Sequence, residues 1–181
     1  QGIDTVVLEQ HSREYVLGRI RAGVLEHGFA KLMREAQVAE RMDREGEIHD
    51  GFFIAHDGIK ERVDLKGLTG GNSVVVYGQT ELTRDLYDGR ERLGGVVIHN
   101  AEDVKPHDLE SAHPYLTYRK GDDVERIDCD YIIGCDGFHG VSRKSIPKDK
   151  ITEFERVYPF GWLGVLSRTK PVSPELIYAK H

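Results

Sequence analysis

Short runs of β-branched residues alternate with stretches of helical periodicity along this chain, and this alternation constrains its fold most. Residues 5–8 form an apolar run that is typical of a fully buried parallel strand, and it ends at Glu9. Apolar residues recur at helical spacing between residues 22 and 36, and again between residues 80 and 93. A run of valines in residues 73–77 precedes the second helical stretch. Strand, helix, strand and helix in succession predict an α/β fold with a Rossmann-like parallel sheet and crossover helices.

Two further stretches predict β-hairpins. In each, a short turn sequence separates two strand-like runs. They are Asp57-Gly58 between residues 52–55 and 61–65, and residues 120–123 between residues 115–118 and 124–127. The hairpins indicate a smaller β-rich part in addition to the parallel sheet.

The stretch Asp130–Arg143 has the pattern of a buried strand, residues 131–133, that leads into a tight turn at Asp136-Gly137. An acid beside a glycine places a carboxylate close to a polar ligand while the chain reverses direction. The basic residues that follow suit a phosphate group. An ordinary surface turn is the alternative explanation of the same residues.

Composition excludes several classes of function. The 181 residues carry a net charge of −6, so there is no overall basic surface for nucleic acid. No apolar run approaches the roughly 18 residues that span a bilayer, and we expect no membrane association. Cys129 and Cys135 are too few for a disulfide framework and lack zinc-ligand spacing, so we expect buried thiols, no metal site and a reducing cytoplasm.

Several polar residues stand where a nucleotide would bind in an α/β sheet. Glu9 ends a strand, where an acid accepts hydrogen bonds from ribose hydroxyls. Arg19 and Arg21 alternate in an extended segment before Ala22-Gly23, which suits a diphosphate. Gln79 follows Gly78 at a strand-to-helix junction. A strand-end acid, a solvated basic pair and a helix cap are the structural alternatives.

Tyr178 and His49 are candidate acid–base groups. A buried phenol shares a proton with a phenolic substrate because both pKa values lie near about 10. A histidine with a near-neutral pKa passes that proton to solvent. The chain has nine histidines and eight tyrosines, so either residue could equally be structural.

Four stretches of the chain resemble the flavoprotein aromatic hydroxylases, and the resemblance extends over essentially the whole chain. They are Tyr15–Glu26 (YVLGRIRAGVLE), Val76–Glu81 (VYGQTE), Cys135–Gly140 (CDGFHG) and Phe154–Gly164 (FERVYPFGWLG). Their length makes the resemblance far more specific than an isolated Asp-Gly turn.

The resemblance implies FAD as the cofactor. It places Glu9 at the adenosine ribose and Arg21 at the diphosphate. The implied cofactor contacts are Glu9, Arg19, Ile20, Arg21, Ala22, Gly23, Val24, Gln79 and Asp136. Among them, the small-residue backbone of residues 22–24 is expected near the isoalloxazine.

The resemblance also implies NADPH or NADH as co-substrate. The implied coenzyme contacts are Gln10, His11, Tyr15, Arg21, His139 and Arg143. Residues 10–11 replace a more basic pair that strongly NADPH-preferring members carry, and a 2′-phosphate is best bound by Arg or Lys. Arg13 is a possible substitute, so the choice of coenzyme stays open.

The implied activity is hydroxylation, with O₂, of an aromatic acid such as 4-hydroxybenzoate at the position ortho to its phenol, giving 3,4-dihydroxybenzoate. Tyr178 would contact the phenolic oxygen of the substrate, and His49 would be the outer member of the proton relay. Phenolate is a better nucleophile than phenol, so deprotonation favours the reaction. The resemblance further implies a homodimer. Another phenolic substrate, or a non-catalytic nucleotide-binding module, is the alternative.

Some parts of the family pattern are not present in this chain. They are the glycine-rich fingerprint, a later Gly-Asp motif, the group that binds the substrate carboxylate and the second tyrosine of the relay. We therefore expect an internal piece of a longer protein, which by itself neither binds FAD tightly nor turns over. The expected domains are residues 1–50 and 76–157 for FAD, 51–75 for a hairpin on the substrate side, and 158–181 for the start of a substrate domain.

Overall fold

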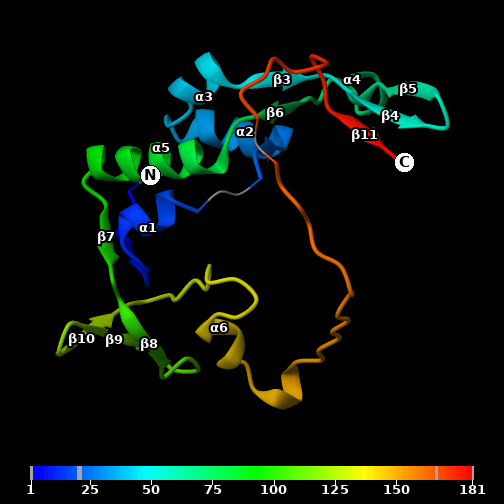
Figure 1. Cartoon of the computed structure of the whole chain (residues 1–181). Helices are drawn as coiled ribbons and strands as arrows, with labels where there is room; N and C mark the ends of the chain where they lie inside the picture. Colours follow the sequence, from blue (N-terminus) through cyan, green and yellow to red (C-terminus); the bar gives the residue numbers. More distant parts are fainter. Residues whose placement is uncertain (1, 20–21, 166, 181) are drawn as a thin grey trace. The chain divides into compact units, whose positions relative to one another are not determined.

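The computed structural model describes residues 2–19, 22–165 and 167–180, and the chain forms two compact units (Figure 1). The first unit comprises residues 1–6, 13–96 and 167–181, and the second comprises residues 7–12 and 97–166. Helices and strands occur together in the chain, and one strand pairing is parallel. The predicted α/β class is confirmed, while the domain boundaries given above stay a prediction.

The first unit contains most of the helices. Its helices are α1 (Arg13–Leu17), α2 (His27–Glu35), α3 (Glu40–Glu45), α4 (Leu65–Leu68) and α5 (Gln79–Arg92). Its strands are β2 (Val24–Leu25), β3 (Glu47–His49), β4 (Phe52–His56), β5 (Ile59–Val63), β6 (Val74–Val76) and β11 (Ile177–Ala179).

Two small sheets organise this unit. In the first, β6 lies between β2 and β3 and is antiparallel to both. In the second, β4 lies between β5 and β11, antiparallel to β5 and parallel to β11 (Figure 1). The predicted turn at Asp57 and Gly58 joins β4 to β5, and both residues have positive φ angles, 48° and 78°. Such angles match the twist of a two-residue hairpin, which is why Asp-Gly is favoured there.

The hydrophobic core of the first unit lies between α2, α3, α5 and β6. Its buried side chains are Leu25, Ala30, Met33, Ala39, Met42, Val75, Tyr77 and Leu82. Ala30 and Met33 are three residues apart on α2 and therefore lie on the same helix face. This core anchors both β6 and the start of α5, the two elements that carry the Gly78-Gln79 junction.

A buried polar network borders this core. The hydroxyl of Tyr77 donates a 2.7 Å hydrogen bond to Oδ2 of Asp85, and Nε of Arg41 donates a 2.8 Å bond to Oδ1 of the same carboxylate. Arg41 also pairs with Glu81. Burial and the neighbouring carboxylate of Asp85 raise the pKa of Tyr77, so its hydroxyl stays a donor at neutral pH.

The second unit is mainly antiparallel. Its strands are β1 (Val6–Glu9), β7 (Val96–His99), β8 (Glu102–His107), β9 (Tyr115–Lys120) and β10 (Asp123–Asp128). The first residues of β1 and β7, Val6 and Val96, are assigned to the first unit. The helices are α6 (Val141–Lys144) and the 3₁₀ helix η1 (Lys148–Lys150). β1 pairs with β7, and β9 lies between β8 and β10. The predicted hairpin at residues 115–127 is confirmed, with Lys120 opposite Asp123.

Several burial predictions are wrong. Residues 131–133 form no strand, and Tyr131 is 87% exposed, because no described strand pairs with this segment. An apolar run becomes a buried strand only where neighbours satisfy its backbone groups and cover its faces. Cys135, in the following turn, is exposed for the same reason. Val6 and Val7 are partly exposed instead of fully buried, since β7 is the one strand that pairs with β1 among the described residues.

Other differences are local. The helix expected from residue 22 begins at His27, because residues 24–25 pair with β6 as β2. Leu65 starts the short helix α4 and does not end a strand, since the side chain of Asp64 accepts a 3.1 Å bond from the backbone N–H of Gly67. In the part of the chain that is described, no helix is long and apolar enough to cross a membrane.

Candidate functional site

Four of the predicted cofactor residues lie together in the first unit, where the segment before β2 runs beside the junction of β6 and α5. The backbone N–H of Tyr77 donates a 2.7 Å bond to the carbonyl of Gly23, and that of Gln79 donates a 3.2 Å bond to the carbonyl of Ala22. Val24 continues the ladder opposite Val76. These hydrogen bonds bring residues 22–24 alongside Gln79, as the cofactor prediction requires.

Gly23 is required by the closeness of the two backbones. A Cβ atom at this position would lie 3.1 Å from Cα of Gly78 and 3.2 Å from the carbonyl oxygen of Tyr77. Both are backbone atoms, so neither neighbour moves aside without disturbing the β2–β6 pairing. Gly78, by contrast, has open space where its side chain would be. The junction therefore combines a tight backbone contact with an open surface.

The N-terminus of α5 is suited to an anionic group. Gly78 is its N-cap and supplies no side-chain acceptor to the first turn. Thr80, in that first turn, donates through its hydroxyl to the carbonyl of Arg19 at 3.3 Å. The guanidinium of Arg19 lies over the ring of Tyr15 at 5.7 Å. A helix N-terminus beside arginine is a favourable place for a phosphate.

His49 is buried, with 5% of its surface exposed, at the end of β3. Its Nδ1 atom accepts a 3.3 Å hydrogen bond from the backbone N–H of Leu176. Neutral His49 therefore carries its proton on Nε2. That Nε2 atom is buried and has no hydrogen-bond partner among the described residues; Oε2 of Glu47 lies 3.9 Å away. Buried polar atoms are nearly always partnered, so this nitrogen suits a water molecule or a ligand.

Tyr178 lies in β11, two residues after Leu176. Its backbone pairs with Ile54 of β4, and its ring packs edge-on against Phe52 with ring centroids 5.4 Å apart. Tyr178 is 59% exposed, so the expectation of a buried phenol is wrong for this chain: Phe52 covers one side of the ring, and its hydroxyl has no partner among the described hydrogen bonds. The two predicted acid–base residues thus belong to neighbouring backbone segments, and Tyr178 is accessible to a ligand.

In the second unit, Glu9 closes a short turn at the end of β1. Its Oε1 atom accepts a 2.9 Å hydrogen bond from the backbone N–H of His11, and its carbonyl accepts one from Ala101 at 3.0 Å. The carbonyl of His11 accepts bonds from the backbone of Asn100 and from Nδ1 of His99. The predicted residues Glu9, Gln10 and His11 therefore form one turn, with Gln10 exposed at its tip.

The carboxylate of Asp136 holds a second turn in this unit. Its Oδ2 atom accepts a 2.9 Å bond from the backbone N–H of Ser142, at the start of α6. This hydrogen bond lowers the pKa of Asp136 below its ordinary value. A Cβ atom at Gly140 would collide with the Asp136 carboxylate, and one at Gly134 would lie 2.5 Å from the side chain of Ser142. Both glycines thus leave room for the turn in which Asp136 is bonded to Ser142.

His139 and Arg143 lie on two sides of Phe138. The rings of His139 and Phe138 meet edge-on at 5.1 Å, and the guanidinium of Arg143 lies 4.3 Å from the centre of the Phe138 ring. Nε of Arg143 also donates a 2.9 Å bond to Oε1 of Glu153. The structure therefore brings two of the predicted coenzyme residues together around an aromatic ring.

Two predicted residues, Ile20 and Arg21, lie outside the described residues. Of the others, Tyr15, Arg19, Ala22, Gly23, Val24, His49, Gln79 and Tyr178 belong to the first unit, and Glu9, Gln10, His11, Asp136, His139 and Arg143 belong to the second. Sequence reasoning did not find the supporting roles of Leu176, Ser142 and Gly140. The glycines within residues 134–140 indicate a tight turn and could have pointed to Gly140. The roles of Leu176 and Ser142 depend on their backbone N–H groups, which every residue except proline has, so the sequence does not indicate them.

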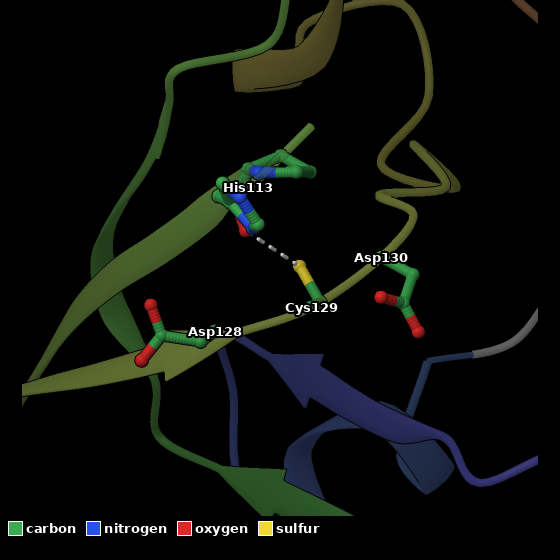
Figure 2. Close-up of a pocket in the computed structure, with 5 residues that line it drawn as sticks. His113, Asp128, Cys129 and Asp130 are labelled. Atoms are coloured by element: carbon green, nitrogen blue, oxygen red, sulfur yellow. Dashed lines mark hydrogen bonds between the residues drawn. The ribbon is translucent and has the colours of Figure 1, made fainter. Parts of the chain in front are cut away.

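The pocket described next is not lined by any of these predicted residues. A pocket of about 440 Å³ in the second unit is lined by His113, Pro114, Asp128, Cys129 and Asp130. Figure 2 shows that Sγ of Cys129 is directed at the carbonyl of Pro114, 3.5 Å away. Burial and the neighbouring acids raise the pKa of the Cys129 thiol, so it is not an activated nucleophile. No group of three or more potential metal ligands occurs within residues 2–19, 22–165 and 167–180.

Comparison with known proteins identifies the family of the chain. The protein family described as "FAD binding domain" matches residues 1–181. The chain belongs to this FAD-binding family. FAD is therefore the cofactor that the family provides for, and the tight Gly23–Gly78 contact beside an uncapped helix N-terminus fits a flavin nucleotide.

One relative of the chain is p-hydroxybenzoate hydroxylase of Acinetobacter baylyi. It is 48% identical over 179 residues, which are 99% of this chain and 44% of the relative. The chain thus spans less than half the length of this relative. The predicted resemblance to flavoprotein aromatic hydroxylases, very close to p-hydroxybenzoate hydroxylase, is confirmed.

Solved structures of flavoproteins share the fold. PqsL of P. aeruginosa, solved in complex with 2-aminobenzoylacetate, matches with a TM-score of 0.64 at 19% identity, over 88% of this chain and 42% of that chain. p-Nitrophenol 4-monooxygenase PnpA of Pseudomonas putida matches with a TM-score of 0.59 at 14% identity, over 72% of this chain and 34% of that chain. At these identities the likeness establishes the fold alone.

Proposed function

We propose that this chain is the FAD-binding part of a monooxygenase that hydroxylates 4-hydroxybenzoate ortho to its phenol, with NAD(P)H and O₂, to give 3,4-dihydroxybenzoate. The hydroxylase class and the family's FAD cofactor are supported along the whole chain by the 48% identical relative and by the family match. The substrate is taken from the name of that relative. Neither of the two structural neighbours described above is named for 4-hydroxybenzoate.

The observation that carries the proposal is the placement of His49 beside the strand of Tyr178. His49 is bonded to the backbone of Leu176, and its buried Nε2 has no hydrogen-bond partner among the residues that the structure describes. The phenol of Tyr178 is exposed two residues further along. A phenolic substrate at Tyr178 would thus meet a strand whose preceding residue is bonded to an imidazole. A purely structural histidine would satisfy both of its ring nitrogens.

The proposal assigns a role to the predicted catalytic residues and to most of the predicted FAD-binding residues. Tyr178 would exchange a proton with the phenol of the substrate, since the two hydroxyls have similar pKa values. His49 would pass that proton towards solvent, and the loss of the proton makes the substrate ring more nucleophilic. Residues 22–24, Arg19, Arg21 and Gln79 would hold and orient the flavin nucleotide, and Glu9 would bind its ribose. Bound FAD supplies the oxygen chemistry, which no side chain of the chain provides.

The co-substrate and the assembly are parts of the same proposal. Asp136, His139 and Arg143 would contact NADPH or NADH, together with Tyr15, Arg21 and the turn of residues 9–11. The aromatic pair of Phe138 and His139, with Arg143 held over the Phe138 ring, supports a role in binding a planar or phosphorylated ligand. We also propose a homodimer in the cytoplasm.

One experiment tests the proposed reaction directly. The full-length protein, which should purify yellow, is mixed with NADPH or NADH and then with 4-hydroxybenzoate, while coenzyme oxidation is followed and the product is identified. We expect substrate to accelerate coenzyme oxidation and 3,4-dihydroxybenzoate to accumulate. A colourless protein would contradict flavin binding. A yellow protein that hydroxylates a different phenol would retain the chemistry but reject the substrate.

A further inference from the structure

An ion pair with two parallel hydrogen bonds stands directly before the strand that carries Tyr178. Nε and Nη2 of Arg62 donate to Oε2 and Oε1 of Glu175, each at 2.7 Å. Arg62 lies in β5, and the two residues are 113 positions apart in the sequence. The side chain of Glu175 is 13% exposed. A two-pronged pair fixes the orientation of both groups, which a single contact does not.

The surroundings of the pair accommodate it closely. A Cβ atom at Gly51 would lie 2.8 Å from Nη2 of Arg62, so a glycine at this position leaves room for the guanidinium. The hydrogen bonds from Arg62 lower the pKa of Glu175, and those to Glu175 raise the pKa of Arg62. Both groups therefore stay ionised across the neutral range. Of the other acids nearby, Asp64 lies 3.7 Å from Arg62, and Glu47 lies 3.9 Å from His49.

The ion pair fixes the beginning of a very short strand. β11 has three residues, Ile177–Ala179, and pairs in parallel with β4. Leu176, immediately after Glu175, donates its N–H to His49 and accepts a 2.8 Å bond from the N–H of Phe53. So short a strand has few ladder hydrogen bonds of its own, and its placement depends on contacts at its ends. The pair is the strongest of these contacts on the N-terminal side.

We propose that Glu175 and Arg62 are positioning residues that set the placement of Tyr178 relative to His49, and hence the transfer of the substrate proton. The inference rests on the proposed function, because it concerns the step in which Tyr178 meets the phenol. Neither residue touches the substrate or the flavin in this role. The pair acts through Leu176, whose backbone both residues hold in place beside His49.

The test uses Glu175→Gln in the full-length protein, because Gln keeps the shape of Glu but offers Arg62 only one acceptor oxygen and no charge. We expect hydroxylation to slow by roughly three- to tenfold, and the pKa of bound 4-hydroxybenzoate, followed by phenolate absorbance, to rise. Flavin content and the rate of flavin reduction by NADPH or NADH should stay within about twofold of the unmodified protein. The double variant Arg62→Glu with Glu175→Arg exchanges the two partners. It should hydroxylate faster than Glu175→Gln, because it restores an ion pair at this position.

Asp43→Asn is the matched control. Asp43 is also bonded to an arginine: Nη2 and Nε of Arg34 donate to its Oδ1 at 2.7 and 2.9 Å, and Nε lies 3.2 Å from its Oδ2. None of the described hydrogen bonds or ion pairs joins Asp43 or Arg34 to β11. This variant should leave the bound-phenol pKa unchanged. If Glu175→Gln does not fold, Arg62→Lys provides the second test, since it keeps the charge and loses the two-pronged geometry.

Two results separate the inference from the proposed function. If Tyr178→Phe changes the bound-phenol pKa and the hydroxylation rate while neither Glu175→Gln nor Arg62→Lys does, the positioning role is wrong and the relay stands. If Tyr178→Phe also has no effect on either quantity, the proposed relay itself fails. A fall in flavin reduction equal to the fall in hydroxylation would show a general structural defect and overturn the positioning role.

Discussion

Nδ1 of His49 accepts a hydrogen bond from the backbone N–H of Leu176, although 127 residues separate the two in the sequence. The bond joins the end of β3 to the start of β11. Because it uses Nδ1, it also determines which nitrogen of neutral His49 carries the proton. This hydrogen bond thus has two consequences. It holds the start of a strand, and it leaves the buried Nε2–H of His49 without a partner in the described part of the chain.

Substitution of His49 separates these two parts. His49→Leu leaves the N–H of Leu176 unpaired and should lower the free energy of unfolding by about 1–3 kcal/mol. His49→Asn keeps an acceptor near the position of Nδ1 and should cost less, while removing the titratable group. Urea unfolding of the two variants measures the difference. Equal loss of stability in both would show that the bond to Leu176 contributes little.

Tyr178→Phe should slow hydroxylation far more than flavin reduction. The phenol is 59% exposed and its ring packs edge-on against Phe52, so the loss of its hydroxyl should leave the fold intact. The expected fall is roughly 100-fold in hydroxylation, the lower end of what a proton-transfer group contributes. Stopped-flow measurement of both steps in the full-length protein checks this. Equal effects on the two steps would exclude the relay role.

Gly23→Ala should impair the cofactor site because a Cβ atom would press on the backbone of Gly78 from 3.1 Å. The backbones of Gly23 and Gly78 must then separate by a few tenths of an ångström, at the place where the flavin is expected. We expect lower flavin content in the purified protein and weaker binding of added FAD. Gly28→Ala is the control, since nothing lies within 4 Å of its Cβ position at the start of α2. Full flavin content in Gly23→Ala would remove Gly23 from the site.

The sequence was sufficient for the local features of the fold. Asp57-Gly58 predicts the β4–β5 hairpin because the conformation of the turn depends on those two residues themselves. The helix of residues 80–93 is predicted to within one residue at each end. Its spaced leucines and the glycine that follows it all lie within one short stretch of sequence. The Gly-Gln junction before α5 belongs to the same class of feature.

Features that depend on pairing between distant segments were not predictable in the same way. The pairing of β2 and β3 with β6, and the contact of Glu175 with Arg62, join residues that no sequence period relates. Tyr131 shows the opposite error, because its apolar run indicates burial while none of the described strands pairs with it. The resemblance to a family suggested the relay residues. That Nε2 of His49 is buried without a hydrogen-bond partner among the described residues is visible only in the structure.

Asp136 should make stability depend on pH in the acid range. Its hydrogen bond from Ser142 lowers the pKa below the ordinary value of 3.8, so the folded state favours the carboxylate. The resulting stabilisation is complete above the unfolded pKa and is lost as the pH falls through the lower, folded pKa. Asp136→Asn keeps an acceptor oxygen for the Ser142 N–H but loses the charge. It should therefore cost only about 0.5 kcal/mol near neutral pH, the difference between a charged and a neutral hydrogen bond, and progressively less below about pH 4.

Hydrogen exchange provides the measurement for Asp136. Protection of the Ser142 amide is compared between the unmodified protein and Asp136→Asn at several pH values, after correction for intrinsic exchange. Protection that is the same in both proteins at neutral pH, or a difference that grows on acidification, would contradict the assignment. Ser145, whose amide is bonded within α6, serves as the internal reference.

Tyr77→Phe tests whether the buried network stabilises the first unit or only fills space. Tyr77 is 5% exposed. Arg41 donates a hydrogen bond to one carboxylate oxygen of Asp85, and the hydroxyl of Tyr77 donates to the other. Removing that donor leaves one oxygen of a nearly buried carboxylate unpaired, so we expect a loss of about 1.5–3 kcal/mol in the free energy of unfolding. Tyr118→Phe is the control, because Tyr118 is similarly buried but no described residue accepts a hydrogen bond from its hydroxyl. A loss no greater than that of Tyr118→Phe would mean that Arg41 alone suffices for Asp85, and the stability of the β6–α5 junction would then rest on apolar packing.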